Sequence, residues 1–135
     1  MSAAYIVAAR RTAVASRGGA FKAVEADELG ATPIRALLSD TGLAPESIDD
    51  VIFGNALYGG GNPARLAARR AGLPDGVPAL TIDSQCCGGL DAIMMAADRI
   101  ASGGADAVIA GGVESYSRSP LRARRPRHAD EAPQP

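Results

Sequence analysis

Two adjacent cysteines, Cys86 and Cys87, are the residues of this 135-residue chain whose type and position suggest chemistry. They follow a short apolar stretch at 79–82 and precede two glycines and a long apolar segment. This order predicts a strand, a short turn and a helix that begins at the cysteines. A helix N-terminus presents unpaired backbone N–H groups and a partial positive charge, which favour a thiolate. A thiolate there would be a good nucleophile for an acyl group, and the N–H groups would help to hold the oxyanion.

A second interpretation of Cys86 stays open at this point, because buried cysteines are common as small hydrophobic side chains. Cys87 is expected to be structural. Neighbouring cysteines cannot build a disulfide framework, so a reducing cytoplasm is the expected compartment. The single histidine, His128, is distant in sequence, and no set of four ligands for a metal is apparent. We expect neither a bound metal nor a bound cofactor.

Composition narrows the class of protein. Hydrophobic residues make up 47% and aromatic residues 4%, with no tryptophan and 16 glycines. A core of small aliphatic side chains suits closely packed α/β layers. The formal net charge of −1 argues against a nucleic-acid partner. No stretch has the length of a membrane span, so no membrane partner is expected.

Apolar runs and turn residues predict an alternating order of elements. Strands are expected at 5–9, 51–53, 79–82 and 107–110. Helices are expected from Asp27 to Gly42, from Asn62 to Ala71 and from Cys86 to Ser102. Pro33 either kinks the first helix or lies in its first turn, and the third helix should be buried on most faces. The order β-α-β-α-β-α-β predicts an α/β fold with a mainly parallel sheet and helices on both faces.

The last segment, 120–135, differs in composition from the domain expected at 1–119. It contains four of the nine prolines, four arginines between 122 and 127, and no large aliphatic residue beyond Leu121. Such a segment cannot bury a core, so we expect a disordered tail in which His128 is a solvated bystander. The abrupt change suggests the hypothesis of a truncation or frameshift in the coding sequence.

Five motifs in register give the chain a resemblance to the N-terminal part of the thiolases, the family of acetyl-CoA acetyltransferases and 3-ketoacyl-CoA thiolases. They are Ile6-Val7-Ala8-Ala9-Arg10-Arg11-Thr12, Gly19-Ala20-Phe21 with Glu28-Leu29-Gly30-Ala31, Gly61-Asn62-Pro63-Ala64-Arg65, Gln85-Cys86-Cys87-Gly88-Gly89-Leu90 and Ala110-Gly111-Gly112-Val113-Glu114-Ser115. The resemblance implies half of the thiolase fold. It also implies that Cys86, and not Cys87, takes an acyl group from an acyl-CoA. The thioester would then serve Claisen condensation or thiolysis of a 3-ketoacyl-CoA, with coenzyme A and acyl-CoA as substrates.

Other groups of the family's active site have no match in these residues. Thiolases are about three times this length. Their second half supplies the histidine of Gly-His-Pro, an asparagine segment and a second cysteine in Cys-x-Gly, and their loop domain usually binds CoA. The resemblance therefore implies a chain that is inactive alone.

Three hypotheses follow: a truncated thiolase-type acyltransferase, a non-catalytic interaction module or half of a split condensing enzyme, and another condensing enzyme such as a ketoacyl synthase. The thiolase versions of the motifs argue against the third. A homodimer or a complementing C-terminal half is the expected partner. Arg65 is expected to be a structural anchor, Glu114 a structural hydrogen-bonding group, and Asp83 a capping or surface residue.

Overall fold

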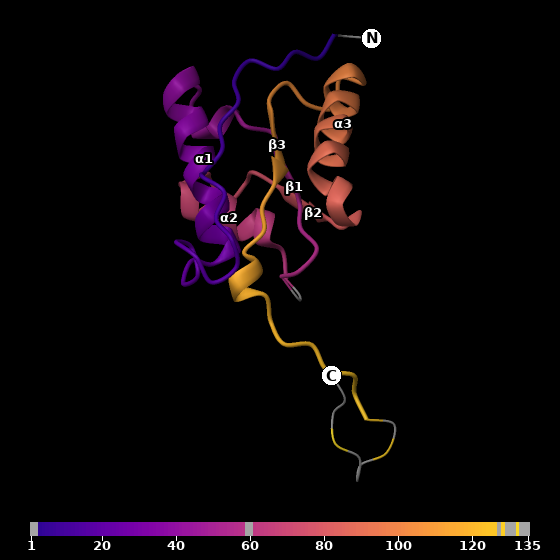
Figure 1. The fold of residues 1–135 in the computed structure, drawn as a ribbon. Helices are drawn as coiled ribbons and strands as arrows, with labels where there is room; N and C mark the ends of the chain where they lie inside the picture. Colours follow the sequence, from indigo (N-terminus) through magenta and orange to yellow (C-terminus); the bar gives the residue numbers. More distant parts are fainter. Residues whose placement is uncertain (1–2, 59–60, 127, 129–131, 133–135) are drawn as a thin grey trace.

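A small parallel sheet with helices on both faces forms the body of the molecule (Figure 1). The computed structural model describes residues 3–58, 61–126, 128 and 132. The strands are β1 (Asp50–Gly54), β2 (Ala79–Ile82) and β3 (Val108–Gly112), in the order β2-β1-β3 with both pairs parallel. The helices are α1 (Ala26–Thr41), α2 (Pro63–Ala71) and α3 (Gly88–Ala101). The predicted α/β class and parallel sheet are confirmed.

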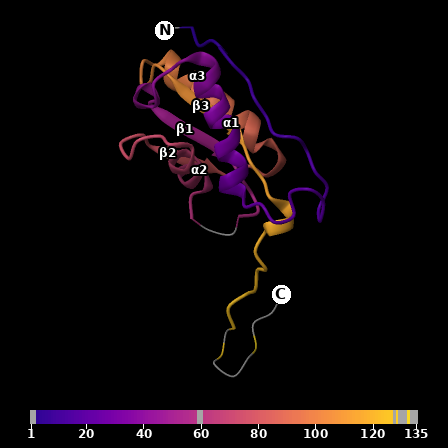
Figure 2. The same ribbon diagram turned by 90° about the vertical axis from the view of Figure 1, so that its left-hand side faces the viewer.

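The central strand β1 is buried on both faces because its side chains alternate between two cores. Val51 and Phe53 face the core built with α1 and α2, and Ile52 faces the smaller core under α3. All three side chains are buried. Alternation of this kind follows from the two-residue period of a strand. The sheet therefore holds α3, the helix that follows the cysteines, on the face opposite α1 and α2 (Figures 1 and 2).

Helix α1 begins at Ala26 and continues through Pro33, so of the two alternatives the late start near residue 33 is wrong. It ends as expected at Gly42, whose φ of 68° is the left-handed conformation that glycine adopts readily. Gly30 brings α1 close to the rest of the core. A β-carbon there would lie 3.1 Å from both Ala67 and Phe53. Helix α2 also begins as predicted, with the Asn62 side chain accepting a hydrogen bond from the Arg65 N–H.

The strand expected at 5–9 is absent, which corrects the sequence prediction. Residues 5–9 are extended but pair with no strand, and Tyr5, Ile6 and Val7 are 78–80% exposed. The segment runs along the outside of the molecule (Figure 2). A groove of about 770 Å³ lies between it and the start of β3 at Val108, which is the edge strand on that side. An apolar run becomes a strand only when a neighbouring strand lies within hydrogen-bonding distance, and none of the described strands pairs with it.

Helix α3 is exposed on its outer face, so the prediction that it is buried on most faces is also wrong. Ala92 and Ala96 are buried against the sheet, whereas Leu90, Ile93 and Met94 are 60%, 42% and 57% exposed. The sheet covers one side of the helix. In the described part of the chain no layer covers the other side (Figure 1).

The segment that follows β3 leaves the body of the molecule in both views (Figures 1 and 2). Among its described residues, Arg122 donates a hydrogen bond to the backbone carbonyl of Ala56 at 2.8 Å. The predicted disorder of 120–135 stays a prediction, and 127, 129–131 and 133–135 lie outside the described residues. No helix in the described ranges is long and apolar enough to cross a membrane.

The carboxylate of Asp49, just before β1, gives the fold a dependence on pH. It accepts hydrogen bonds from the backbone N–H groups of Ala107 (3.0 Å) and Asp106 (2.7 Å), which lower the pKa of Asp49 below the ordinary value of an aspartate. A lowered pKa in the folded state stabilises the fold above the unfolded pKa, and this stabilisation is lost as the pH falls through the folded value. We expect Asp49→Asn to be less stable than the wild type near neutral pH, with the difference shrinking in acid. Urea unfolding of both chains at several pH values, from neutral to acid, measures this difference in stability. A difference that is constant with pH would contradict the assignment.

Candidate functional site

Cys86 lies at the carboxyl edge of the sheet, where the chain turns from β2 into α3. After Ile82 the chain makes a short turn, then a 3₁₀ turn over Gln85–Cys87, and enters α3 at Gly88. The predicted strand-turn-helix junction is therefore present. Both cysteines are free and exposed. This exposure is inconsistent with the interpretation of Cys86 as a core side chain, and Cys87 does not pack in the core either.

Glycines allow the beginning of α3 to lie directly on the ends of two strands. A β-carbon on Gly54, at the end of β1, would lie 2.3 Å from the carbonyl carbon of Gly88. A β-carbon on Gly112, at the end of β3, would lie 3.4 Å from the Cα of Gly89. The first of these distances is far inside van der Waals contact, so only glycine fits at position 54. These two close contacts, of Gly54 with Gly88 and of Gly112 with Gly89, fix how near the start of α3 lies to the sheet. They therefore also fix the position of Cys86 at the sheet edge.

The residue before Cys86 has an unusual backbone. Gln85 has a φ of 55°, the only positive φ of a non-glycine residue in the ranges that the structure describes. The Asp83 carboxylate accepts hydrogen bonds from the backbone N–H and the side-chain Nε2 of Gln85, both at 3.0 Å. The chain thus bends sharply at 85 and presents Cys86 outward. The sequence indicated a turn here, but a left-handed glutamine has no signal in a single sequence.

A hydrogen-bond network at the ends of β1 and β3 supports the same edge. Glu114 accepts hydrogen bonds from the side chain of Asn55 and from the backbone N–H groups of Ala56 and Leu57, each at 3.1 Å. Asn55 also donates to the carbonyl of Val113 at 2.8 Å. The expected structural role of Glu114 is confirmed. Asn55 carries no signal in the sequence, because the network joins residues almost sixty positions apart.

A second network ties the start of α2 to β2. The Asn62 Oδ1 accepts a hydrogen bond from the Thr81 hydroxyl at 2.6 Å, and its Nδ2 donates to the carbonyl of Ala79 at 2.8 Å. Arg65 donates to the carbonyls of Val77 and Asp75. These contacts confirm Arg65 as a structural anchor and hold β2, the strand that leads to Cys86.

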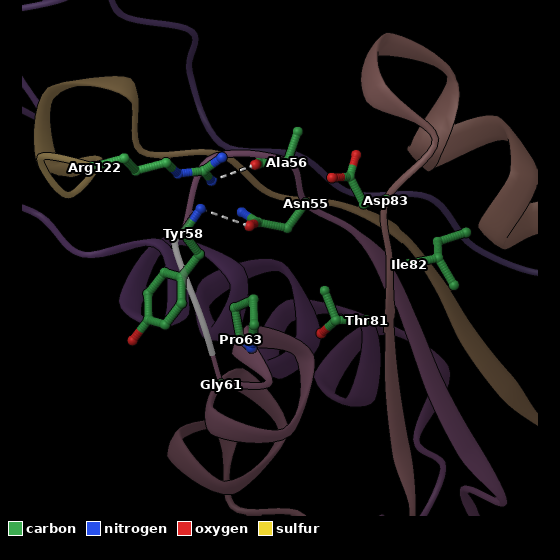
Figure 3. A pocket seen from close by; sticks show the side chains of 9 residues that line it. All are labelled: Asn55, Ala56, Tyr58, Gly61, Pro63, Thr81, Ile82, Asp83 and Arg122. Carbon is green, nitrogen blue, oxygen red and sulfur yellow. Dashed lines mark hydrogen bonds between the residues drawn. The ribbon is translucent and has the colours of Figure 1, made fainter. Parts of the chain in front are cut away.

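An open pocket of about 490 Å³ lies beside this edge (Figure 3). Its lining comes from distant segments: Asn55, Ala56, Tyr58, Gly61, Pro63, Thr81, Ile82, Asp83 and Arg122. Within it, Asn55 accepts a hydrogen bond from the N–H of Tyr58 at 3.0 Å (Figure 3). Cys86 does not line this pocket, although Asp83, three residues earlier, does. No local sequence pattern joins these segments, so the sequence alone does not predict this pocket.

His128 is exposed. This agrees with the prediction that it is a solvated bystander. Within the described ranges, no three His, Cys, Asp or Glu side chains gather as metal ligands would.

Comparison with known proteins identifies the family. Residues 4–133 match the family model described as thiolase, N-terminal domain. The chain belongs to the thiolase family. The resemblance to the N-terminal part of the thiolases is thereby confirmed.

Thiolase relatives share about half of their residues with this chain over the matched region. A Staphylococcus aureus protein named "Probable acetyl-CoA acyltransferase" is 47% identical over 123 residues, which cover 90% of this chain and 31% of the relative. A Chromobacterium violaceum "Acetyl-CoA acetyltransferase" is 52% identical over 117 residues, which cover 85% and 30%. The crystal structure of the Bacillus anthracis acetyl-CoA acetyltransferase superposes with a TM-score of 0.77 at 38% identity, covering 87% of this chain and 32% of that one. This thiolase chain therefore spans about a third of the length of these relatives.

Proposed function

We propose that this chain carries the acyl-accepting nucleophile of a thiolase-type acyltransferase, and that the nucleophile is Cys86. The observation that carries the proposal is the exposed thiol of Cys86 at the sharp turn between β2 and α3. Family membership supports it, since the relatives are named as acetyl-CoA acyltransferases and acetyltransferases.

In this proposal the Cys86 thiolate attacks the carbonyl carbon of an acyl-CoA. A C–S bond forms to Cys86, the bond to the CoA sulfur breaks, and CoA leaves as a thiolate that takes up a proton. The partial positive charge at the start of α3 stabilises both the attacking thiolate and the oxyanion. In condensation, the α-carbon of a second acyl-CoA loses a proton and attacks the thioester carbonyl, so that a C–C bond forms and the C–S bond to Cys86 breaks. In thiolysis, Cys86 attacks the 3-keto carbon of a 3-ketoacyl-CoA, the bond between carbons 2 and 3 breaks, and the acyl-CoA carbanion that leaves takes up a proton. Free CoA then attacks the thioester, which transfers the acyl group to CoA and releases the Cys86 thiolate. Acyl-CoA and CoA are substrates, and no bound cofactor takes part.

The general acid and base are proposed to come from a complementing C-terminal half, because no histidine lies beside Cys86 in the described residues. The outer face of α3 supports this. Leu90, Ile93 and Met94 follow one another at helical spacing and are exposed, which is the pattern of a helix face that packs against another layer. An exposed apolar stripe of this kind commonly marks an interaction site. A homodimer through the same face is the competing arrangement, and sedimentation of the chain alone distinguishes the two.

Met94→Glu is expected to abolish this association without unfolding the chain. The Met94 side chain is 57% exposed here, so a carboxylate would be solvated in the free chain but buried and unpaired in the complex. The measurement is co-purification with the remaining C-terminal portion of the Staphylococcus aureus relative, supplied as a separate chain. Glu28→Lys, at an exposed position of α1 on the opposite face of the sheet, is the control and should still associate. Equal association of both variants would contradict the proposed interface.

The chemical step is tested by incubating the purified chain with acetyl-CoA and measuring intact mass. We expect one acetyl group per chain, released by neutral hydroxylamine as a thioester is. The adduct should accumulate slowly without the acid–base groups, since each typically supplies about 10²–10⁴-fold in rate. A chain that stays unmodified would contradict the proposed nucleophile. If it still associated through α3, that result would instead favour the non-catalytic interaction module.

The cytoplasm is the proposed location, because both cysteines are free and the proposed chemistry requires a reduced thiol.

A further inference from the structure

The turn that presents Cys86 depends on Gln85, which takes up a left-handed backbone conformation. This conformation brings the Cβ of an L-residue too close to the following carbonyl oxygen, so glycine, asparagine and aspartate adopt it far more readily than glutamine does. A glutamine held there requires surrounding contacts that outweigh the strain.

The side chain of Asp83 provides such contacts. One oxygen, Oδ1, accepts both the backbone N–H and the side-chain Nε2 of Gln85, each at 3.0 Å. The first contact forms an Asx turn, in which an aspartate side chain accepts a hydrogen bond from the backbone N–H of the residue two positions later. The second holds the glutamine side chain against Asp83. The Cys87 N–H then bonds to the carbonyl of Ser84 at 3.3 Å and completes the turn.

Electrostatics argue against a role for Asp83 in raising the reactivity of the thiol. A negatively charged side chain at position 83 would not assist a negatively charged nucleophile at position 86, because like charges repel. Its two hydrogen bonds to Gln85, in contrast, fix the backbone from which the thiol projects. The geometric and the electrostatic effects of removing the carboxylate therefore have opposite signs.

We propose that Asp83 is a positioning residue, which locks Gln85 in the left-handed conformation and so aims Cys86 at the acyl carbonyl. The inference rests on the proposed function of Cys86 as the nucleophile. Asp83 acts through Gln85 and has no part in bond making.

The test uses a Cys87→Ser background, so that Cys86 is the only thiol. Three quantities are measured: acetylation by acetyl-CoA, alkylation by iodoacetamide across pH, and amide hydrogen exchange over residues 84–88. Acetylation depends on the aim of the thiol, whereas alkylation of an exposed cysteine depends mainly on its ionisation. We expect Asp83→Ala to slow acetylation by about tenfold, which corresponds to ~1.4 kcal/mol, to leave alkylation no slower, and to speed exchange.

Two rescue variants separate positioning from a general loss of structure. Asp83→Asn keeps the accepting oxygen without the charge and should acetylate within about twofold of the parent, well inside the ~1.4 kcal/mol that a tenfold change represents. Gln85→Gly, which adopts a positive φ without strain, should restore acetylation in the Asp83→Ala chain. Gln85→Val, which is β-branched, should slow acetylation as Asp83→Ala does.

The outcomes are distinct. Faster acetylation in both Asp83→Ala and Asp83→Asn would show that charge dominates and would overturn the inference, as would unchanged acetylation and exchange in Asp83→Ala. If the parent chain is not acetylated at all, the proposed function fails. The proposed positioning of Gln85 by Asp83 is then tested by amide exchange alone: faster exchange in Asp83→Ala, reversed in Asp83→Asn, supports it, and equal exchange in the two variants and the parent overturns it.

Discussion

Gly54→Ala is expected to destabilise the fold by about 3 kcal/mol and to displace the start of α3. The new β-carbon would lie 2.3 Å from the carbonyl carbon and 2.6 Å from the Cα of Gly88. These are backbone atoms, which cannot rotate away as a flexible side chain does. Strand β1 is the central strand and is buried along its whole length, so it cannot shift to relieve the overlap. The helix must move instead, and Cys86 moves with it.

Urea unfolding and the acetylation rate of Cys86 together measure this effect. Gly76→Ala is the matched control, because a β-carbon at Gly76 meets no atom within 4 Å and its φ is not positive. It should change the free energy of unfolding by no more than about 0.5 kcal/mol. A Gly54→Ala chain as stable and as reactive as the wild type would show that α3 does not sit on β1 as described.

Arg99→Met is expected to cost about 3 kcal/mol of unfolding free energy. Asp50, the first residue of β1, is 3% exposed, and its carboxylate is paired with Arg99 of α3. Removing one partner of a buried ion pair costs about 3–5 kcal/mol, because an uncompensated charge remains. We expect the lower end of this range, since the Arg99 side chain is 40% exposed and water can reach the pair.

Adding Asp50→Asn to Arg99→Met should restore part of the lost stability. In the wild type, Asp50 Oδ1 accepts a hydrogen bond from the N–H of Val51 at 2.8 Å. An asparagine at position 50 removes the unpaired charge and keeps an oxygen that can accept this hydrogen bond. Arg10→Met is the comparison, because Asp40, the partner of Arg10, is more exposed than Asp50. The ion pair of Arg10 with Asp40 should therefore contribute less than about 1 kcal/mol to stability. Equal losses for Arg99→Met and Arg10→Met would contradict the burial argument.

The elements that the sequence predicted correctly carry strong local signals. Asn62 followed by proline marked the start of α2, and Gly42 marked the end of α1. The strands β1, β2 and β3 are short apolar runs between turn residues, and each lies within a residue or two of its expected place. The position of Cys86 followed from the same signals, because a strand, a turn and a helix leave few places for the residue between them.

The errors concern what each element lies against, which a local pattern does not contain. Residues 5–9 have the composition of a strand, but strand formation requires a paired neighbour. Helix α3 is apolar enough to be buried on most faces, yet whether a second layer exists depends on residues distant in sequence. The network of Asn55 and the left-handed backbone of Gln85 also escaped prediction, since each depends on a hydrogen bond or a backbone angle seen only in the folded chain. Asp83 was expected to be a capping or surface residue, and it is exposed with its carboxylate accepting the Gln85 N–H.

The most direct test of the central claim is to locate the acetyl group after incubation with acetyl-CoA. Cys86→Ser and Cys87→Ser form a matched pair, because the two residues are adjacent, exposed and alike in chemistry. We predict that intact mass and peptide mapping will find a hydroxylamine-sensitive acetyl group in the wild type and in Cys87→Ser, and none in Cys86→Ser. An acetyl group that persists in Cys86→Ser and disappears in Cys87→Ser would contradict the account.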